Sequence, residues 1–187
     1  MPANVEIKAR VADPPALLAR ARALSDTPPE VLHQRDTFFR CPTGRLKLRE
    51  SGPGRGELIW YLRSDTAASR RSEWLVTPVE DPGSLRAVLD RAWGTARVVE
   101  KTRTLLRVGR TRIHLDDVAG LGHFVELEVV LDDGQAEGEG HAIAADLMRR
   151  LGIAAADLLD VAYADMPPVR PPESHFGPPA PREPRRS

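Results

Sequence analysis

The sequence of 187 residues has a single cysteine, few aromatic residues and no excess of charge of either sign. The lone Cys41 excludes a disulfide bond within the chain and a zinc site built from cysteines. Basic and acidic residues number 27 each, and this balance argues against general nucleic-acid or membrane-surface binders, which normally carry a basic excess. No apolar run approaches the ~18 residues of a membrane-spanning helix. We therefore expect a soluble, cytoplasmic protein without a nucleic-acid or membrane partner.

The composition fits a globular domain followed by a short tail of different character. Hydrophobic residues make up 41% of the chain and charged residues 29%, which excludes disorder of the whole chain. The segment from Met166 to Ser187 contains eight of the 17 prolines. Because proline fixes φ and lacks an amide proton, this segment can neither join a sheet nor continue a helix. We predict a folded domain over residues 1–165 and a disordered or extended tail over 166–187.

Alternation of apolar and polar residues is the dominant pattern of the folded part, and it predicts an α+β fold with antiparallel strands. The predicted strands span about 4–10, 34–40, 45–50, 57–64, 72–78, 97–107, 111–116 and 123–131. Apolar residues at helical spacing predict helices over about 14–25, 84–93, 137–151 and 155–163. Short connections between most strands favour antiparallel neighbours. Gly109 predicts a tight hairpin, and Ser84 and Gly94 predict the two ends of the second helix.

The polar faces of several predicted strands carry charges that are sorted by sign. Residues at i and i+2 share one face of a strand, so the pairs are Lys47 with Arg49, Lys101 with Arg103, and Glu126 with Glu128. One interpretation is a plain sheet whose charged face meets water. Mixed signs would serve that face better than pairs of like charge. We therefore favour an eight-stranded antiparallel β-barrel with the charged faces inside.

An interior of this kind suits a polyphosphate accompanied by divalent cations. Lysine and arginine neutralise phosphate oxygens, arginine with two parallel hydrogen bonds. Carboxylates bind Mg²⁺ or Mn²⁺, and these ions also bridge to phosphates. Four carboxylates are candidates for holding one or two such ions: Glu6, Asp116, Glu126 and Glu128.

Seven charged segments occur in a fixed order along residues 1–165. They are NVEIKAR (4–10), QRDTFF (34–39), GRLKLRE (44–50), YLRSD (61–65), EKTR (100–103), RIHLD with the following Val118 (112–118) and LGHFVELE (121–128). In this order and spacing they resemble the CYTH superfamily of triphosphate tunnel metalloenzymes, most closely its class IV adenylyl cyclase-like branch. The resemblance covers nearly all of residues 1–165.

The resemblance implies an eight-stranded antiparallel β-barrel tunnel with helices packed outside, and it implies roles for individual residues. The implied catalytic residues are Glu6, Lys8, Glu126 and Glu128. The implied triphosphate-binding residues are Lys8, Lys47, Arg49, Arg63, Lys101, Arg103 and Arg112. The implied metal ligands are Glu6, Asp116, Glu126 and Glu128. Asp36 and Tyr163 are expected to border the tunnel.

The sequence departs from the family pattern in its first strand. The family's N-terminal E-x-E-x-K motif reads Asn4-Val5-Glu6-Ile7-Lys8 here. The Asn4 amide offers a neutral oxygen in place of a carboxylate, so a metal ion there would be held more weakly. The number of metal ions, one or two, is therefore left open.

Three functions are compatible with such a tunnel and a small-molecule triphosphate substrate. The first is class IV-type adenylyl cyclase chemistry, which converts ATP into cyclic AMP and pyrophosphate with Mg²⁺ or Mn²⁺. The second is a triphosphatase that hydrolyses inorganic triphosphate, thiamine triphosphate or nucleoside triphosphates. The third is a non-catalytic polyphosphate binder, against which the retained carboxylates argue. A homodimer is compatible with the residues but not required by them, and the sequence identifies no general base.

Overall fold

Alternating apolar and charged residues form eight strands, as the pattern predicts. The computed structural model describes residues 4–62, 73–132 and 134–167. The strands are β1 (Asn4–Arg10), β2 (Glu30–Phe39), β3 (Arg45–Glu50), β4 (Gly56–Leu62), β5 (Glu73–Val79), β6 (Thr95–Val108), β7 (Thr111–Val118) and β8 (Gly122–Val130). They make one antiparallel sheet in the order β1-β8-β7-β6-β2-β3-β4-β5.

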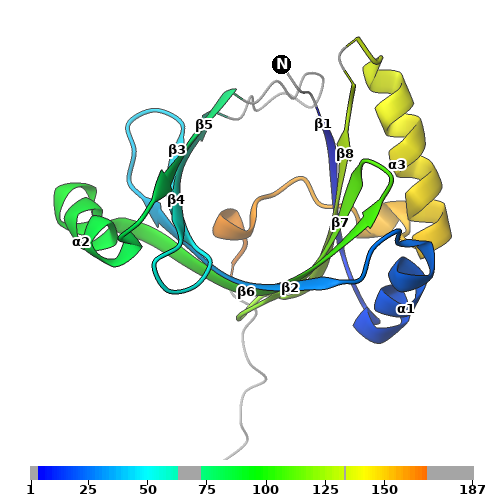
Figure 1. The fold of residues 1–187 in the computed structure, drawn as a ribbon, viewed down its shortest axis with the longest axis horizontal. Helices are drawn as coiled ribbons and strands as arrows, with labels where there is room; N and C mark the ends of the chain where they lie inside the picture. The colour runs from blue at the N-terminus through cyan, green and yellow to red at the C-terminus, as the bar shows by residue number, and fades with distance from the viewer. Residues whose placement is uncertain (1–3, 63–72, 133, 168–187) are drawn as a thin grey trace, which may run out of the picture.

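The sheet curls into a half-barrel with the helices outside it (Figure 1). Strands β1 and β5 are its two edges, and within the described residues they do not pair with each other. The predicted eight-stranded antiparallel barrel is thus confirmed as a curled half-barrel. Its ring is not closed by backbone pairing in the part of the chain that the structure describes.

The helices bury the apolar face of the sheet on its convex side. Helices α1 (Pro14–Leu24) and α3 (Glu137–Leu151) pack near β1, β6, β7 and β8. Leu17 and Leu147 there contact a core that includes Leu106, Ile113 and Leu127. Each such side chain stabilises the fold by about 1.5–3 kcal/mol through burial. The charged side chains of the same strands are thereby directed to the concave side.

Helix α2 (Pro82–Trp93) covers the other half of the convex face and corrects one detail of the sequence prediction. Its N-cap is Asp81, whose carboxylate accepts a hydrogen bond from the Ser84 amide at 3.0 Å. Ser84 is therefore not the N-cap, because Pro82 already occupies the first turn, where no amide proton is needed. Gly94 ends the helix as predicted, with φ 76°.

Strands β6 and β7 form the predicted hairpin, and β2, which pairs with β6, is longer than the pattern suggests. Gly109 has φ 53° in the short turn between β6 and β7, which confirms the hairpin. Strand β2 begins at Glu30, four residues earlier than predicted, because residues 30–33 pair with the distal half of β6. Without residues 30–33, that half of β6 would pair only with β7.

The helix predicted over 155–163 is wrong. Two single 3₁₀ turns, η1 (Ala155–Asp157) and η2 (Tyr163–Asp165), flank an extended stretch. In this stretch Leu158 forms an isolated bridge with Ala9, and the Leu159 amide donates to the Lys8 carbonyl at 2.9 Å. Pairing with the edge strand satisfies backbone groups that a helix would have paired internally. We call residues 155–166 the C-terminal strap.

The strap crosses the concave side of the sheet (Figure 1). Met166 at its end is buried in an apolar cluster. The predicted tail lies outside the described residues from position 168 onward. Within the described ranges, no helix is long and apolar enough to cross a membrane.

The packing of α3 can be tested at its two early glycines. A Cβ at Gly140 would lie 2.7 Å from Leu131 Cδ2 and 2.8 Å from Val5 Cγ2. We expect Gly140→Ala to destabilise the protein by about 1–3 kcal/mol, because the sheet must move away. Gly138→Ala, where a Cβ meets nothing within 4 Å, should instead stabilise it by about 0.5–1 kcal/mol. Urea denaturation measures both, and equal effects would contradict the packing.

Candidate active site

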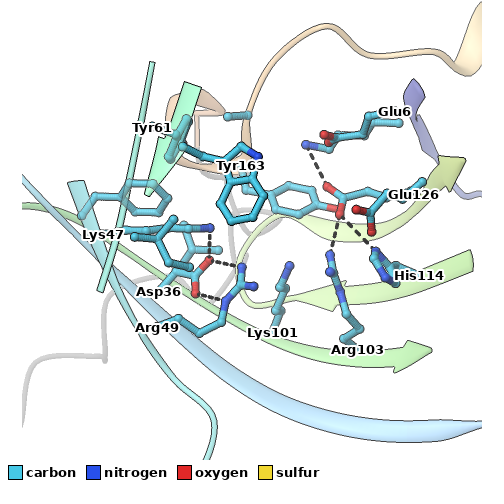
Figure 2. Close-up of a pocket in the computed structure, with 17 residues that line it drawn as sticks. Glu6, Asp36, Lys47, Arg49, Tyr61, Lys101, Arg103, His114, Glu126 and Tyr163 are labelled. Atoms are coloured by element: carbon cyan, nitrogen blue, oxygen red, sulfur yellow. Dashed lines mark hydrogen bonds and ion pairs between the residues drawn. The ribbon is translucent and has the colours of Figure 1, made fainter. Parts of the chain in front are cut away.

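The concave face of the half-barrel holds a cavity of about 330 Å³ that every strand of the sheet helps to line. Each strand contributes from its concave-facing positions, and the strap contributes Ala162 and Tyr163. Figure 2 shows charged side chains from several strands pointing toward one another across this space. The charged faces therefore lie on the concave side and line one cavity, as the sorting of charges predicted.

Asp36 on β2 holds two cations of β3. Its carboxylate accepts hydrogen bonds from Lys47 Nζ at 2.9 Å, Arg49 Nε at 2.8 Å and Arg49 Nη2 at 2.9 Å (Figure 2). The Arg49 contact is a two-pronged arginine–carboxylate pair, the geometry that gives strong and directional binding. We call Asp36, Lys47 and Arg49 the first clamp.

Asp116 on β7 holds two cations of β6 in the same way. Its carboxylate accepts from Lys101 Nζ at 3.1 Å and from Arg103 Nε and Nη2 at 2.6 Å each. It also accepts from the Tyr163 hydroxyl of the strap at 3.0 Å. The Asp116 side chain has no exposed surface. We call Asp116, Lys101 and Arg103 the second clamp.

The two clamps have the same backbone register. Arg49 lies directly opposite Asp36, and Arg103 lies directly opposite Asp116. In each clamp the lysine stands two residues before the arginine, which makes it the diagonal neighbour of the aspartate. Diagonal neighbours across antiparallel strands are within reach of long side chains. The Lys-x-Arg spacing and the strand register together create two matched pairs of cations.

Glu126 on β8 joins the second clamp to the first strand. Its carboxylate lies 3.0 Å from Lys8 Nζ and 2.5 Å from Arg103 Nη2, and His114 Nδ1 lies 3.8 Å away (Figure 2). Burial alone would raise the pKa of Glu126, but His114, Lys8 and Arg103 hold it well below its usual range. Burial lowers the pKa of His114 despite Glu126. At neutral pH we therefore assign an ionised Glu126 beside a neutral imidazole.

The aspartates of both clamps are ionised, and burial changes the pKa of Lys47 in the first clamp. Burial would raise the pKa of Asp36, but Lys47 and Arg49 hold it far below the ordinary value. For Asp116 burial is likewise outweighed, here by Arg103 and Lys101, and its pKa is lowered. Burial lowers the pKa of Lys47 to about 8, in spite of the attraction of Asp36.

The C-terminal strap lines part of the cavity with Ala162 and Tyr163. Tyr163 packs on Phe124 with ring centroids 5.0 Å apart, and Lys8 Nζ lies 4.2 Å from the centre of the Tyr163 ring. Burial and the neighbouring carboxylates raise the pKa of Tyr163, so its hydroxyl keeps its proton and donates to Asp116. The strap is also tied to β3, because Arg45 Nη2 lies 2.8 Å from Asp165.

The wall of the cavity opposite Glu6 and Glu126 is apolar and aromatic. It consists of Phe38, Ile59, Tyr61 and Trp74, from β2, β4 and β5. Lys47 Nζ lies 5.6 Å from the centre of the Phe38 ring and 5.9 Å from that of Tyr61. The cavity thus has a carboxylate side and an aromatic side, and the cations of the two clamps lie between them (Figure 2).

Most of the predicted site residues line this one cavity. They are Glu6, Lys8, Lys47, Arg49, Lys101, Arg103, Glu126 and Glu128. Asp116 lies behind the lining, where its oxygens are occupied by the second clamp and Tyr163. Arg112 is outside the lining and half-exposed, and its Nη1 contacts Glu128 at 3.0 Å. Arg63 lies outside the described residues.

The carboxylates suited to a metal ion lie on adjacent strands. Glu6 and Glu128 are opposite each other across β1 and β8, and Glu126 is two residues from Glu128 on the same face. Such hard oxygen donors match Mg²⁺ and Mn²⁺. Within the described residues, no three His, Cys, Asp or Glu side chains already form a metal-binding group. Asn4 donates its amide to Glu128 at 3.1 Å, so in this structure it orients a carboxylate.

Sequence reasoning did not assign roles to three important side chains. Asp36 and Tyr163 were expected only to border the tunnel, and His114 was assigned to none of the site roles. Alternation places Asp36 and His114 on the charged faces, but it does not reveal which cation each contacts. Tyr163 was placed at the tunnel on a predicted helix, and its hydrogen bond to Asp116 from the extended strap was not predicted.

The comparisons with known proteins agree with this architecture. The CYTH domain family matches residues 2–163. The chain therefore belongs to the CYTH family, which includes adenylate cyclases and triphosphatases and is generally metal-dependent. The expected family and the expected class, enzyme, are confirmed at this level.

Similar proteins come from bacteria, archaea and plants. The chain is 26% identical over 171 residues to adenylate cyclase CyaB of Aeromonas hydrophila, with 86% of each chain covered. The PH1012 protein of Pyrococcus horikoshii OT3 has the same fold, with a TM-score of 0.76, 23% identity and coverage of 87% of this chain and 98% of that one. A candidate adenylyl cyclase from Hippeastrum with a dominant triphosphatase activity has a TM-score of 0.60, 16% identity and coverage of 81% and 89%.

The anchoring of the strap can be tested at Tyr163. Tyr163→Phe removes one hydrogen bond to the buried Asp116 carboxylate and keeps the ring packing. We expect a loss of about 1–3 kcal/mol in the free energy of unfolding, measured by chemical denaturation. Asp165→Asn, which cuts only the part-exposed ion pair with Arg45, should cost less than about 1 kcal/mol. If Tyr163→Phe leaves the free energy of unfolding unchanged, the anchoring is contradicted.

Proposed function

We propose that this protein is a metal-dependent adenylyl cyclase that converts ATP into cyclic AMP and pyrophosphate in the concave cavity. The observation that carries the proposal is the pair of matched Lys-x-Arg clamps beside a group of carboxylates. Cations held in fixed positions neutralise phosphate oxygens without reorganising during the reaction. The clamps would bind the triphosphate, and the carboxylates would bind the accompanying metal.

The charge balance of the cavity supports a metal requirement. Among the described residues, its lining carries the cations Lys8, Lys47, Arg49, Lys101 and Arg103 and the carboxylates Glu6, Asp36, Glu126 and Glu128. With Asp116 directly behind the lining, positive and negative side chains are equal in number. A bound triphosphate would make this cavity strongly negative unless divalent cations entered with it.

Glu6, Glu126 and Glu128 are the residues that would hold Mg²⁺ or Mn²⁺. When bound, such an ion neutralises phosphate charge and makes the phosphorus a better electrophile. Asp116 is assigned a different role from the one expected, because its oxygens already serve the second clamp. It positions Lys101 and Arg103, and through Tyr163 it holds the strap against the cavity.

In the proposed reaction the ribose 3′ oxygen attacks the α-phosphorus of ATP. The bond to the bridging oxygen breaks, the hydroxyl loses its proton, and pyrophosphate leaves with the electron pair of the broken bond. Arg49 and Arg103 each present a planar group whose N–H donors match phosphate oxygens. The residues thus accelerate the reaction by holding the chain of phosphates in line and by neutralising the leaving group.

The aromatic wall favours a substrate with a ring over inorganic triphosphate. Tyr61 lies across the cavity from Glu6 and Glu126 (Figure 2), and Phe38 and Trp74 line the same cavity. Stacking on aromatic side chains is a common way to bind a nucleobase without hydrogen bonds. Inorganic triphosphate has no group that would use this wall. ATP has one, and so do thiamine triphosphate and other nucleoside triphosphates.

Triphosphate hydrolysis is the second candidate function. The Hippeastrum protein, described by its dominant triphosphatase activity, shares the fold. In this reaction water attacks the terminal phosphorus, so the same clamps would bind the substrate shifted along the cavity. One scaffold can support both reactions.

A product assay separates the candidate functions. The purified protein is incubated with Mg²⁺ or Mn²⁺ and, separately, with ATP, thiamine triphosphate or inorganic triphosphate. We expect cyclic AMP and pyrophosphate in equal amounts from ATP. Phosphate without cyclic AMP would replace the cyclase by a triphosphatase. Tight binding without turnover of any of the three would leave only a binding protein.

The proposed metal ligands are tested best at Glu128, because it is less buried than Glu126 and less tightly paired. We expect Glu128→Gln to lower kcat by about 100-fold or more while the fold is retained. Glu137→Gln, the same change at an exposed position of α3, should leave kcat unchanged. Full activity of Glu128→Gln would contradict the metal assignment.

The aromatic wall is tested at Trp74, a half-exposed residue of the edge strand β5. We expect Trp74→Ala to raise KM for ATP about tenfold, because a stacking surface for the base is lost. The affinity of the Trp74→Ala variant for inorganic triphosphate should equal that of the unaltered protein. Trp93→Ala, at the exposed end of α2, serves as the matched control. A parallel loss for both ligands would argue against base stacking.

A further inference from the structure

In the first clamp Lys47 and Arg49 share one hydrogen-bonded carboxylate, that of Asp36. In the second clamp Arg103 contacts both Asp116 and Glu126, so two carboxylates attract this cation. Within the described parts of the chain, the carboxylate that accepts hydrogen bonds from Lys47 and Arg49 is that of Asp36. Asp36 has 4% of its surface exposed. Its removal would leave two poorly hydrated cations without the carboxylate to which they are hydrogen-bonded.

Lys47 needs that partner more than Arg49 does. A guanidinium stays protonated in any protein environment, whereas a buried ammonium loses its proton readily. The groups that face Lys47 are Asp36 on β2, Arg49 on its own strand, Tyr61 on β4 and Lys101 on β6. The other two cations among these repel its charge, and Asp36 is the one that attracts it.

We propose that Asp36 is a positioning residue for triphosphate binding: it keeps Lys47 protonated and fixes Lys47 and Arg49 as one half of the phosphate cradle. The inference rests on the proposed function for the identity of the ligand, but not for its action on Lys47. Asp36 itself does not contact phosphate, since its negative charge would repel it. Its effect reaches the ligand through the two cations.

The position of Asp36 makes this role separable from that of the metal. The first clamp lies on the aromatic side of the cavity, away from Glu6 and Glu126 (Figure 2). Its contribution to anion binding should therefore be measurable without a divalent cation. The first clamp lies on the neighbouring strands β2 and β3, whereas the proposed metal ligands lie on β1 and β8.

The first experiment measures binding of inorganic triphosphate by calorimetry in the absence of metal. Asp36→Asn should weaken binding by about 10- to 100-fold at pH 7.5, the loss expected when charge-assisted hydrogen bonds no longer fix the two cations. Asp117→Asn is the matched control, because Asp117 follows Asp116 on β7 but is exposed on the other face. It should bind like the unaltered protein. Equal affinities for all three proteins would overturn the inference.

The pH dependence gives a readout that a general loss of structure would not produce. With the pKa of Lys47 at about 8, Lys47 is charged below that pH, so triphosphate binding should weaken as the pH rises through about 8. Without the negative charge of Asp36 the pKa of Lys47 falls further, and the weakening should begin at a lower pH in Asp36→Asn. An unchanged pH profile would contradict the proposed action on Lys47.

A second variant and a second measurement cover failure of folding or of ligand binding. Asp36→Glu keeps the charge, so it should retain the alkaline limb near pH 8 even if its longer side chain weakens binding. If the unaltered protein binds no triphosphate either without metal or with Mg²⁺, the proposed function fails. The inference can still be tested by NMR titration of the Lys47 ammonium group. A lower Lys47 pKa in Asp36→Asn supports it, and an equal pKa overturns it.

Discussion

Lysine and arginine side chains on the inside of a curled sheet lose their hydration, and only paired carboxylates can compensate for that loss. Asp36 and Asp116 provide this compensation from the strands next to the cations. Each aspartate faces an arginine and reaches a lysine diagonally, so one register serves both clamps. The curl of the sheet, the convex helices and the strap all hold these pairs away from bulk water.

The same constraint underlies the proposed binding of an anion in the cavity. A cation whose charge is fully neutralised by its partner attracts an anion only weakly. In each clamp, however, one aspartate is shared between two cations. Each clamp therefore keeps net positive character toward the cavity, while Glu6, Glu126 and Glu128 provide the negative side. Opposite charges on two sides of one cavity suit a phosphate chain that arrives together with a divalent cation.

Much of this molecule could be predicted from its sequence, because strand periodicity determines which side chains share a face. The antiparallel strands, the hairpin at Gly109 and the enclosed charged faces follow from alternation and turn residues. The partners of Asp36 and Asp116 depend on the register between strands, which alternation does not define. The strap was missed because Leu158 and Leu159 pair with the edge strand β1, a tertiary contact that overrides a local helical pattern.

The most direct test of the account is a crystal structure of the protein with inorganic triphosphate and Mn²⁺, with the manganese located by its anomalous scattering. The account predicts phosphate oxygens within hydrogen-bonding distance of the Lys47, Arg49, Lys101 and Arg103 side chains. It also predicts a manganese peak beside the carboxylates of Glu6, Glu126 and Glu128. Triphosphate bound on the convex face, or a manganese ion remote from these carboxylates, would contradict it.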